Sequence, residues 1–519
     1  MTWKPEADEI ARRRQWAQEH GGAEAVRSYR KQGWLTIRER IDTLVDAGSF
    51  QEIGGLSGSA TYSDGKVNKV VPAPYVMGLA KLDGRAVAVG GEDFSVRGGV
   101  NWGARSKGGQ GGFSGDLAYE YCIPLVNFCH GSGGSVGSTR QRGHAVFPGA
   151  RLSPHYVDLL GRVPVVSAVM GTTAGGPAGR AILSHFSVMV QGQSQVFASG
   201  PPMVERALGI KIGKEELGGA KVAAGIAGTI DNVAASEEDC IAMVKRFLSY
   251  MPQNVWQLPP VTPCDDPADR MEEALLTLLP RNRRAPYDMR KLFGMIVDRG
   301  SVFEIQPLFG RALITALARM NGRPVGIIAN NPMVNGGALD AKAARKQTHF
   351  IDLCDTFHIP LIFFVDLPGF MIGPQAEEDA TLREGMRSLH ARMQATVPMI
   401  SVVIRKCYGF AGFAARDSLG LDFKVAWPSA EIGSLPVEGG VTVAYRREIA
   451  CAPDPARRQA ELEDEIRSLA SPFRMAEAFA VEDVIDPRET RRYLCRIVGA
   501  MEERLRMGLG VKARAGVRP

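Results

Sequence analysis

The stretch Phe363-Phe-Val-Asp-Leu-Pro-Gly-Phe370 decides the fold of this chain, because it carries an apolar run into a Pro-Gly turn. A second apolar run, residues 399–404, is followed by the glycine turn Tyr408-Gly-Phe-Ala-Gly412. Continuous apolar runs of this length are typical of strands that are buried on both faces of a parallel sheet. Two such strands, each ending in a glycine turn that opens a helix, would place free backbone N–H groups at one edge of the sheet. Because such groups bind a negatively charged oxygen, this edge is predicted to carry a site.

The same order of segments occurs in the first half of the chain. Residues 83–99 align without a gap with residues 321–337, and each segment ends in a Gly-Gly pair. Three further matches follow in order, namely 123–128 with 359–364, the turn 132–134 with 368–370, and 163–167 with 397–401. Four ordered matches at a nearly constant offset indicate an internal duplication. We therefore predict two homologous α/β domains, residues 1–260 and 268–519, joined by a proline-rich linker.

The composition is that of an ordinary globular protein, with 45% hydrophobic and 23% charged residues among 519. A net charge of +6 is small for this length, so nothing demands a nucleic-acid partner. The eight cysteines contain no Cys-x-x-Cys pair and no signal peptide is found, so we expect reduced thiols and a cytoplasmic protein. The eight histidines lack metal-ligand spacing, and no apolar run reaches the ~18 residues of a membrane span. Neither a metal nor a membrane is expected.

Several short motifs occur in a fixed order along both halves. They are Ser132-Gly-Gly134, Met170-Gly-Thr-Thr-Ala-Gly-Gly176, Glu215-Glu-Leu-Gly-Gly-Ala220, Ala329-Asn-Asn-Pro-Met333, Asp355-Thr-Phe-His-Ile-Pro360, Val365-Asp-Leu-Pro-Gly-Phe370, Arg405-Lys-Cys-Tyr-Gly409, Trp427-Pro-Ser-Ala-Glu431 and Val484-Ile-Asp-Pro-Arg488. Each motif alone is weak, but together they are specific. With them the chain resembles the β (carboxyltransferase) subunit of biotin-dependent acyl-CoA carboxylases, the propionyl-CoA and methylcrotonyl-CoA carboxylase group.

The resemblance implies two tandem crotonase-like domains, each a twisted β-sheet flanked by helices. The first would bind acyl-CoA and the second carboxybiotin, with an active site between the first domain of one subunit and the second domain of another. It also implies a hexamer, β6 within α6β6. The chain has no Met-Lys-Met biotin-attachment tripeptide and no ATP-binding loop. A separate biotinylated α subunit, with biotin carboxylase and carrier domains, is therefore expected as partner.

By the same resemblance, each domain has an oxyanion hole. The backbone of Gly133 and Gly134 would hold the thioester oxygen of an enolate, with a structural tight turn as the alternative. The backbone of Phe410 and Ala411 would hold the ureido oxygen of biotin. Cofactor binding is assigned to the neighbouring residues Gly369, Phe370, Tyr408 and Gly409. Substrate binding is assigned to Gly175, Gly176, Phe413 and Arg140.

In the family's mechanism a ureido nitrogen of biotin accepts the α-proton, which agrees with the lack of a Ser/His/Asp set in this sequence. Asp366 is expected to bond the backbone of its turn rather than act as a base. Residues 135–142 depart from the family pattern, and Arg140, Arg142 and His144 would face CoA phosphates or form a solvated helix face. Phe413 would reshape the acyl pocket, and the glycine-rich loop 97–116 is expected to overlie a site. The acyl group is therefore not assigned.

Three other functions remain open at this point. A carboxyltransferase subunit of a Na⁺-pumping decarboxylase would run the same half-reaction backward. A biotin-independent crotonase-type enzyme would have one domain and a carboxylate near the hole, and the duplication argues against it. A non-catalytic scaffold subunit would have a damaged hole, whereas the Gly133-Gly134 pair is intact.

Overall fold

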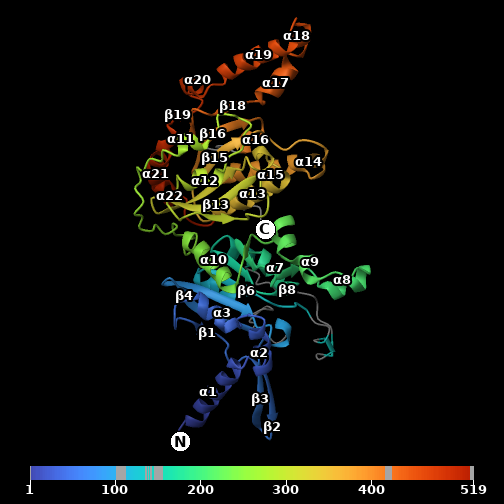
Figure 1. Ribbon diagram of the computed structural model, residues 1–519. Coiled ribbons are helices and arrows are strands. Elements are labelled where there is room, and N and C mark those ends of the chain that lie inside the picture. Colours follow the sequence, from blue (N-terminus) through green and yellow to red (C-terminus); the bar gives the residue numbers. More distant parts are fainter. Residues whose placement is uncertain are drawn as a thin grey trace. The chain divides into compact units, whose positions relative to one another are not determined.

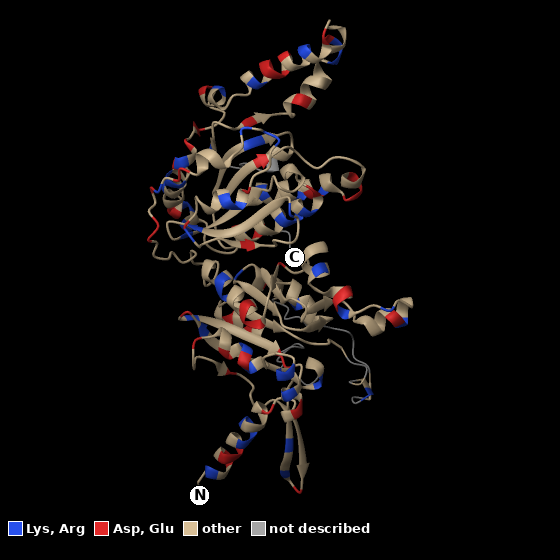
Figure 2. Cartoon of the chain, in the orientation of Figure 1, with Lys and Arg blue, Asp and Glu red and all other residues tan. Residues whose placement is uncertain are grey.

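The computed structural model describes residues 2–100, 113–134, 137, 139–140, 143–144, 156–414 and 423–514. The chain divides into two compact units, Met1–Gln257 and Leu258–Arg518 (Figure 1). Each unit has its own mostly parallel sheet with helices packed on it. Acidic and basic residues are interspersed along the described parts of both units (Figure 2). The architecture of each unit is therefore α/β, as predicted.

The first unit is built on a seven-stranded sheet in the order β1-β4-β5-β6-β7-β9-β11. β4 runs antiparallel to β1 and β5, and each step from β5 to β11 is parallel. β2 and β3 form a separate hairpin, and β8 and β10 a separate parallel pair. The strands are β1 (Gln51–Glu52), β2 (Gly58–Ser63), β3 (Lys66–Pro72), β4 (Tyr75–Leu82), β5 (Arg85–Glu92), β6 (Leu125–Cys129), β7 (Val165–Val169), β8 (Thr172–Ala174), β9 (Phe186–Val190), β10 (Gln195–Phe197) and β11 (Asn232–Ala234).

Helices of the first unit begin where the sequence supplies a cap. Thr36 accepts a hydrogen bond from the Glu39 N–H and starts the helix over 37–44, which buries Ile37, Ile41 and Leu44. In Figure 1, α1 and the β2–β3 hairpin extend from the sheet, and α1 packs on β3. The helices are α1 (Lys4–Gln18), α2 (Ala23–Lys31), α3 (Ile37–Leu44), η1 (Arg97–Gly99), α4 (Ser114–Tyr121), α6 (Tyr156–Leu160), α7 (Gly176–Ile182), α8 (Pro201–Leu208), α9 (Lys214–Gly218), the π-helix η2 (Lys221–Ile226) and α10 (Glu237–Tyr250).

The second unit has an eight-stranded sheet in the order β12-β13-β14-β15-β16-β17-β19, with β18 paired to the end of β16. β12, β13 and β14 pair antiparallel, and each pairing from β14 onward is parallel. The order of strand directions thus repeats that of the first unit. The strands are β12 (Phe303–Ile305), β13 (Leu313–Met320), β14 (Arg323–Asn330), β15 (Leu361–Leu367), β16 (Met399–Tyr408), β17 (Phe423–Ala426), β18 (Glu431–Gly433) and β19 (Asp483–Val484).

The core of the second unit lies between its sheet and helices that include α12 and α21. Every residue of β15 is buried, as is every residue of β6 in the first unit, which explains why each strand is apolar except for one residue. The helices are α11 (Leu275–Leu278), α12 (Met289–Gly294), η3 (Asn335–Gly337), α13 (Ala341–Thr356), α14 (Pro374–Glu378), α15 (Thr381–Gln394), α16 (Ala411–Ala414), α17 (Val437–Ala444), α18 (Arg446–Cys451), α19 (Pro455–Leu469), α20 (Pro472–Glu477), η4 (Pro487–Glu489), α21 (Thr490–Ala500) and α22 (Glu502–Met507).

The two units share individual hydrogen bonds in corresponding turns, namely the turn before β5 and the turn before β14. In the first unit Asp46 accepts from the N–H groups of Asp83 and Gly84, at 3.0 and 2.8 Å. In the second unit Asp298 accepts from the N–H groups of Asn321 and Gly322, at 2.9 and 2.7 Å. Both residues of each turn have positive φ, as in a type I′ hairpin. An aspartate therefore fixes the same turn in both units.

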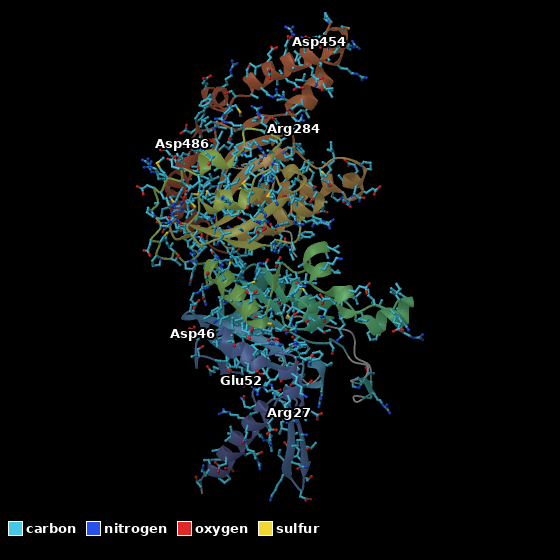
Figure 3. All side chains as sticks on the ribbon, in the orientation of Figure 1. Arg27, Asp46, Glu52, Arg284, Asp454 and Asp486 are labelled. Atoms are coloured by element: carbon cyan, nitrogen blue, oxygen red, sulfur yellow. The ribbon has the colours of Figure 1, made fainter. Side chains whose placement is uncertain are left out.

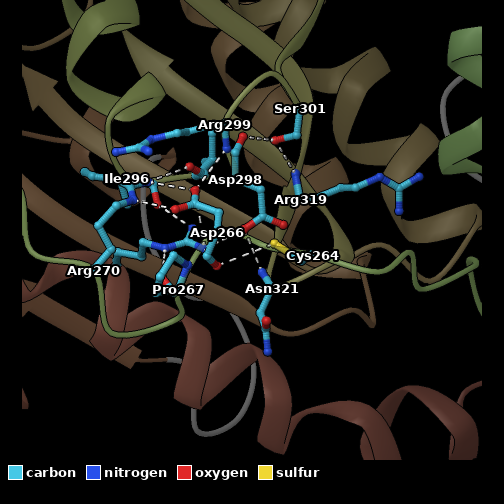
Figure 4. A network of polar contacts seen from close by, with 12 residues as sticks. Cys264, Asp266, Pro267, Arg270, Ile296, Asp298, Arg299, Ser301, Arg319 and Asn321 are labelled. Atoms are coloured by element: carbon cyan, nitrogen blue, oxygen red, sulfur yellow. Dashed lines mark hydrogen bonds and ion pairs between the residues drawn. The ribbon is translucent and has the colours of Figure 1, made fainter.

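Asp298 differs from Asp46 in its surroundings (Figures 3 and 4). The guanidinium of Arg491, on α21, donates to Asp298 at 2.8 Å and to the carbonyl oxygens of Asp266, Pro267 and Ile296. This network ties the last long helix to the first residues of the second unit. Asp46 is half-buried and pairs with no arginine that the structure describes.

We predict that Asp298→Ala destabilises the protein more than Asp46→Ala. Loss of Asp298 leaves the buried Arg491 with only the more distant carboxylate of Asp266, at 3.6 Å, and breaking a buried pair typically costs about 3–5 kcal/mol. Loss of Asp46 removes backbone hydrogen bonds at a wetter position, for about 1–2 kcal/mol. Urea unfolding of both variants, with tryptophan fluorescence, measures the difference. Equal losses would show that the Arg491 pair adds nothing to the turn.

Candidate active site

The first candidate site lies at the carboxyl ends of the parallel strands of the first unit. β6 ends at Cys129, which pairs with Val169 at the end of β7. Beyond this pair, the Gly131 oxygen accepts a hydrogen bond from the Ala174 N–H at 2.9 Å. The loop 130–134 is thereby held against β8, which leads directly into α7.

Two glycine backbones approach each other closely at this edge. Gly133 has φ +77°, and a Cβ placed on it would lie 2.8 Å from the Ala174 oxygen and 3.5 Å from Cα of Gly175. Gly175 has φ +60° and is the N-cap of α7. A side chain at Gly133 would therefore be strained and would collide with backbone, so only glycine fits there.

The N–H groups of four glycines are available at this edge. Those of Gly133, Gly134, Gly175 and Gly176 donate to no other residue that the structure describes. Gly175 and Gly176 begin a helix, where unbonded N–H groups are expected. The structure thus brings together two glycine pairs to which the sequence analysis assigned different roles. Gly133 and Gly134 were assigned to the oxyanion hole, and Gly175 and Gly176 to substrate binding. Such a set of donors can hold a developing oxyanion.

Buried charged residues that the sequence motifs missed surround this loop. Arg40 pairs with Glu237 at 2.6 Å and contacts the ring of His130 at 3.4 Å. The His130 ring stacks on Phe94, with centroids 4.3 Å apart. Burial, with Arg40 nearby, holds the pKa of His130 well below its usual value, so its ring is neutral. His130 therefore serves as a packed support for the loop that follows it.

Glu92 and Arg180 form a second buried pair beside the same loop. Glu92 is the last residue of β5, and its other oxygen accepts from the His130 N–H at 3.3 Å. A signal was present in the sequence, because the acidic Glu92 directly follows an uncharged run at 86–91. Its partner lies far along the chain and could not be found from spacing.

The second candidate site lies at the carboxyl end of β16. Gly409 has φ +65°, and its N–H donates to the Gly433 oxygen at 3.0 Å. Phe410 follows with 52% of its surface exposed, and the buried Ala411 begins α16. The Ala411 N–H donates to no residue within the described ranges. This short helix start repeats the arrangement at Gly175 and Gly176.

Tyr408 is fixed by a charged neighbour on β18. Its hydroxyl donates to Glu431 at 2.7 Å, and Glu431 also pairs with Arg283 at 2.5 Å. Burial and the hydrogen bond to Glu431 raise the pKa of Tyr408, so the hydroxyl stays protonated. Tyr408 therefore holds β18 against the end of β16, beside Gly409.

Gly369 and Phe370 follow the neighbouring strand, β15. The Gly369 oxygen accepts from the Leu339 N–H at 3.0 Å, and Phe370 forms a parallel bridge with Leu339. A Cβ on Gly385 would overlap the Phe370 ring, so this ring packs directly on α15. Because Leu367 pairs with Cys407, the turns after β15 and β16 open at the same edge of the sheet.

Asp366 is occupied by structural contacts. It pairs with the buried Arg405 at 2.9 Å and accepts from the Lys406 N–H at 3.1 Å. The expectation that it bonds its own turn was wrong, because the bonded backbone belongs to β16. An ion-paired carboxylate with no exposed surface is not placed to act as a general base.

The remaining predicted residues are placed only in part. Arg140 and His144 are exposed, and Arg142 lies outside the described residues. The backbone of Phe413 belongs to α16, but its side chain lies outside the description, as do residues 101–112 of the glycine-rich loop. In the part of the chain that the structure describes, no cluster of three or more His, Cys, Asp or Glu could hold a metal ion. None of the described helices is long and apolar enough to cross a membrane.

Comparison with known proteins identifies the class to which these two sites belong. The model of the carboxyl transferase domain matches residues 28–514. The carboxyltransferase subunit of propionyl-CoA carboxylase from Haloferax mediterranei is 35% identical over 499 residues, 95% of each chain. Methylmalonyl-CoA decarboxylase subunit alpha from Veillonella parvula is 33% identical over 476 residues, 91% of each chain.

A solved structure gives the same result. The transcarboxylase 12S crystal structure, a hexamer with methylmalonyl-coenzyme A and methylmalonic acid bound, superposes with a TM-score of 0.88 and 33% identity. The match covers 100% of this chain and 97% of that one. The chain therefore belongs to the carboxyl transferase domain family. This confirms the resemblance stated from the motifs, the crotonase-like fold and the activity of an acyl-CoA carboxyltransferase.

We predict that Gly133→Ala lowers the rate of carboxyl transfer to acyl-CoA by about 100-fold or more, because a displaced oxyanion donor typically costs this much. Gly65→Ala is the control, since Gly65 also has positive φ but has open space at the tip of the β2–β3 hairpin. Steady-state rates and thermal midpoints of both variants separate the two effects. Equal activity in the two variants would remove Gly133 from the site.

Proposed function

We propose that this chain is the carboxyltransferase subunit of a biotin-dependent acyl-CoA carboxylase, working with a separate biotinylated subunit. The observation that carries the proposal is the close approach of Gly133 and Gly175 at the start of α7. In the second unit, Gly409 likewise has positive φ and precedes a helix start, at Ala411. Two helix starts with unbonded N–H groups would provide two separate oxyanion sites, one for each carbonyl compound between which the carboxyl group is transferred.

In the first unit, the N–H groups of Gly133, Gly134, Gly175 and Gly176 would hold the thioester oxygen of acyl-CoA. Deprotonation at the α (or vinylogous) carbon places negative charge on that oxygen. Donors fixed in advance stabilise this charge without reorganisation, by a few kcal/mol each. The acidity of the thioester is thereby raised, and no side chain needs to change its protonation state.

The residues after β16 in the second unit have the chemical groups that biotin binding needs. The Ala411 N–H suits the ureido oxygen, and the exposed face of Phe410 suits an apolar ring system. Gly369, Phe370, Tyr408 and Gly409 would form the walls around it. Carboxybiotin, when bound, supplies the CO₂ and a ureido nitrogen that accepts the α-proton. The buried Asp366–Arg405 pair would keep the ends of β15 and β16 in place during turnover.

The assembly and substrate are proposed from the relatives. A hexamer is supported by the transcarboxylase 12S structure, and short acyl-CoAs such as propionyl-CoA by the relatives' names. A decarboxylase direction is the second candidate, because the Veillonella parvula relative is a decarboxylase subunit. One site catalyses both directions, so the partner subunits decide between them.

Isolation of the complex from its native host tests the proposal. We expect a large biotinylated subunit with ATP-dependent carboxylase activity to co-purify, detected with labelled streptavidin. The complex, supplied with ATP and bicarbonate, should then carboxylate at least one acyl-CoA of a panel of chain lengths. A small biotinylated protein with membrane subunits would identify a decarboxylase instead. Absence of any biotinylated partner would contradict both and leave a biotin-independent acyl-CoA enzyme.

A further inference from the structure

The buried carboxylate of Glu92 contacts the two segments that carry the donors of the first site. One oxygen accepts from the backbone N–H of His130, directly before the loop 131–134. The other pairs with the guanidinium of Arg180, in the last turn of α7. The Glu92 side chain has no exposed surface, so water does not weaken either contact.

Backbone packing places Glu92 in the middle of this arrangement. A Cβ on Gly131 would lie 3.0 Å from Cγ of Glu92 and 3.1 Å from the Pro177 ring of α7. A Cβ on Gly99 would lie 3.1 Å from Cβ of Glu92 and 2.7 Å from the His130 oxygen. Three segments therefore pack around one side chain, namely η1, the loop after β6 and α7.

Arg180 is held from its other sides as well. Its guanidinium lies 5.9 Å from the centre of the Tyr75 ring, and its backbone oxygen accepts from the Ser167 hydroxyl at 3.2 Å. Tyr75 is on β4 and Ser167 on β7, so Arg180 connects α7 to two strands of the sheet. Because α7 begins at Gly176, the position of Arg180 sets the position of its first N–H groups.

The second unit shows what the charge of Glu92 adds. Asn330 ends β14 as Glu92 ends β5, and its Oδ1 accepts from the Asp366 N–H at 3.2 Å, as Glu92 does from His130. The backbone-holding role thus needs only a neutral amide. In that unit the buried ion pair is Asp366–Arg405, which joins two strands. The negative charge at position 92 serves the contact with α7.

We propose that Glu92 and Arg180 are positioning residues for the first oxyanion site, fixing the distance between the loop 131–134 and the start of α7. This proposal deepens the function proposed above and rests on it. Donors misplaced by ~1 Å lose much of their effect in the transition state, whereas CoA binding depends on contacts elsewhere. Loss of the pair should therefore lower kcat more than it raises KM.

Glu92→Gln tests the charge, because the amide can still accept from His130 but no longer neutralises Arg180. In the complex with its biotinylated partner, we expect kcat to fall about 10- to 100-fold, with KM for acyl-CoA changed less than about threefold. Glu92→Gln/Arg180→Gln removes both charges and guards against misfolding from an unpaired guanidinium. Because the two residues act as a unit, the kcat of the double variant should be no lower than that of Glu92→Gln.

Asp266→Asn is the matched control. Asp266 is a carboxylate with little exposed surface, paired with Arg270 at 2.6 Å, and it belongs to the network at the amino ends of the parallel strands of the second unit (Figure 4). We expect its kcat to remain within about twofold of the wild type, whatever its loss of stability. Wild-type kcat in either folded Glu92 variant would overturn the proposal, as would an equal loss in Asp266→Asn.

Amide hydrogen exchange gives a readout that does not depend on turnover. We expect faster exchange in peptides covering 129–134 and 175–182 of Glu92→Gln, and unchanged exchange there in Asp266→Asn. If the wild-type complex carboxylated no acyl-CoA, the proposed function would fail. Faster exchange in Glu92→Gln would still show that Glu92 and Arg180 hold the loop 131–134 and α7 in place. Unchanged exchange in both segments of Glu92→Gln would refute the positioning role of Glu92 and Arg180, even in an active enzyme.

Discussion

The close approach of two glycine backbones at the carboxyl edge of the first sheet is the constraint on which the rest depends. Gly133 and Gly175 can approach because neither carries a side chain and both have positive φ. Their contact brings the loop and the helix start that carry the four unbonded N–H groups together at the same edge of the sheet. The buried parallel strands, the caps and the ion pairs around them keep this edge rigid.

The duplication explains why a chain of this length carries two such edges. Each unit repeats the aspartate that fixes the turn, Asp46 or Asp298. Each also repeats a side chain, Glu92 or Asn330, that accepts a hydrogen bond from a backbone N–H at the carboxyl end of the neighbouring strand. The copies differ where charge is placed, with Glu92–Arg180 tying a helix in the first unit and Asp366–Arg405 tying strands in the second. Under the proposed function, these two related sites would take two different ligands, a thioester in the first unit and a ureido ring in the second.

Much of this arrangement could be predicted from the sequence, because it depends on local patterns. Continuous apolar runs predicted β15 and β16. The glycine turns predicted the position of the candidate sites, because a positive φ depends on the type of a single residue. The alignment of the halves predicted the repeated sheet without any structural information.

Long-range pairing could not be predicted in the same way. Glu92 and Arg180 are far apart in the chain, and no periodicity connects an acid at a strand end with a cation on a helix. Asp366 was expected to bond its own turn, but a buried carboxylate selects the nearest cation, and Arg405 lies on the adjacent strand. Separation in the sequence therefore limited the prediction of the site's support more than of its donors.

The most direct test of the central claim is isotope-edited infrared spectroscopy of a ¹³C-labelled acyl-CoA thioester bound to the protein. Hydrogen bonds from the glycine N–H groups polarise the carbonyl, so its stretching band should move to lower frequency on binding. Gly133→Ala should abolish this shift while CoA remains bound. A carbonyl band at the same frequency in free and bound acyl-CoA would contradict the assignment of an oxyanion site to Gly133 and Gly175.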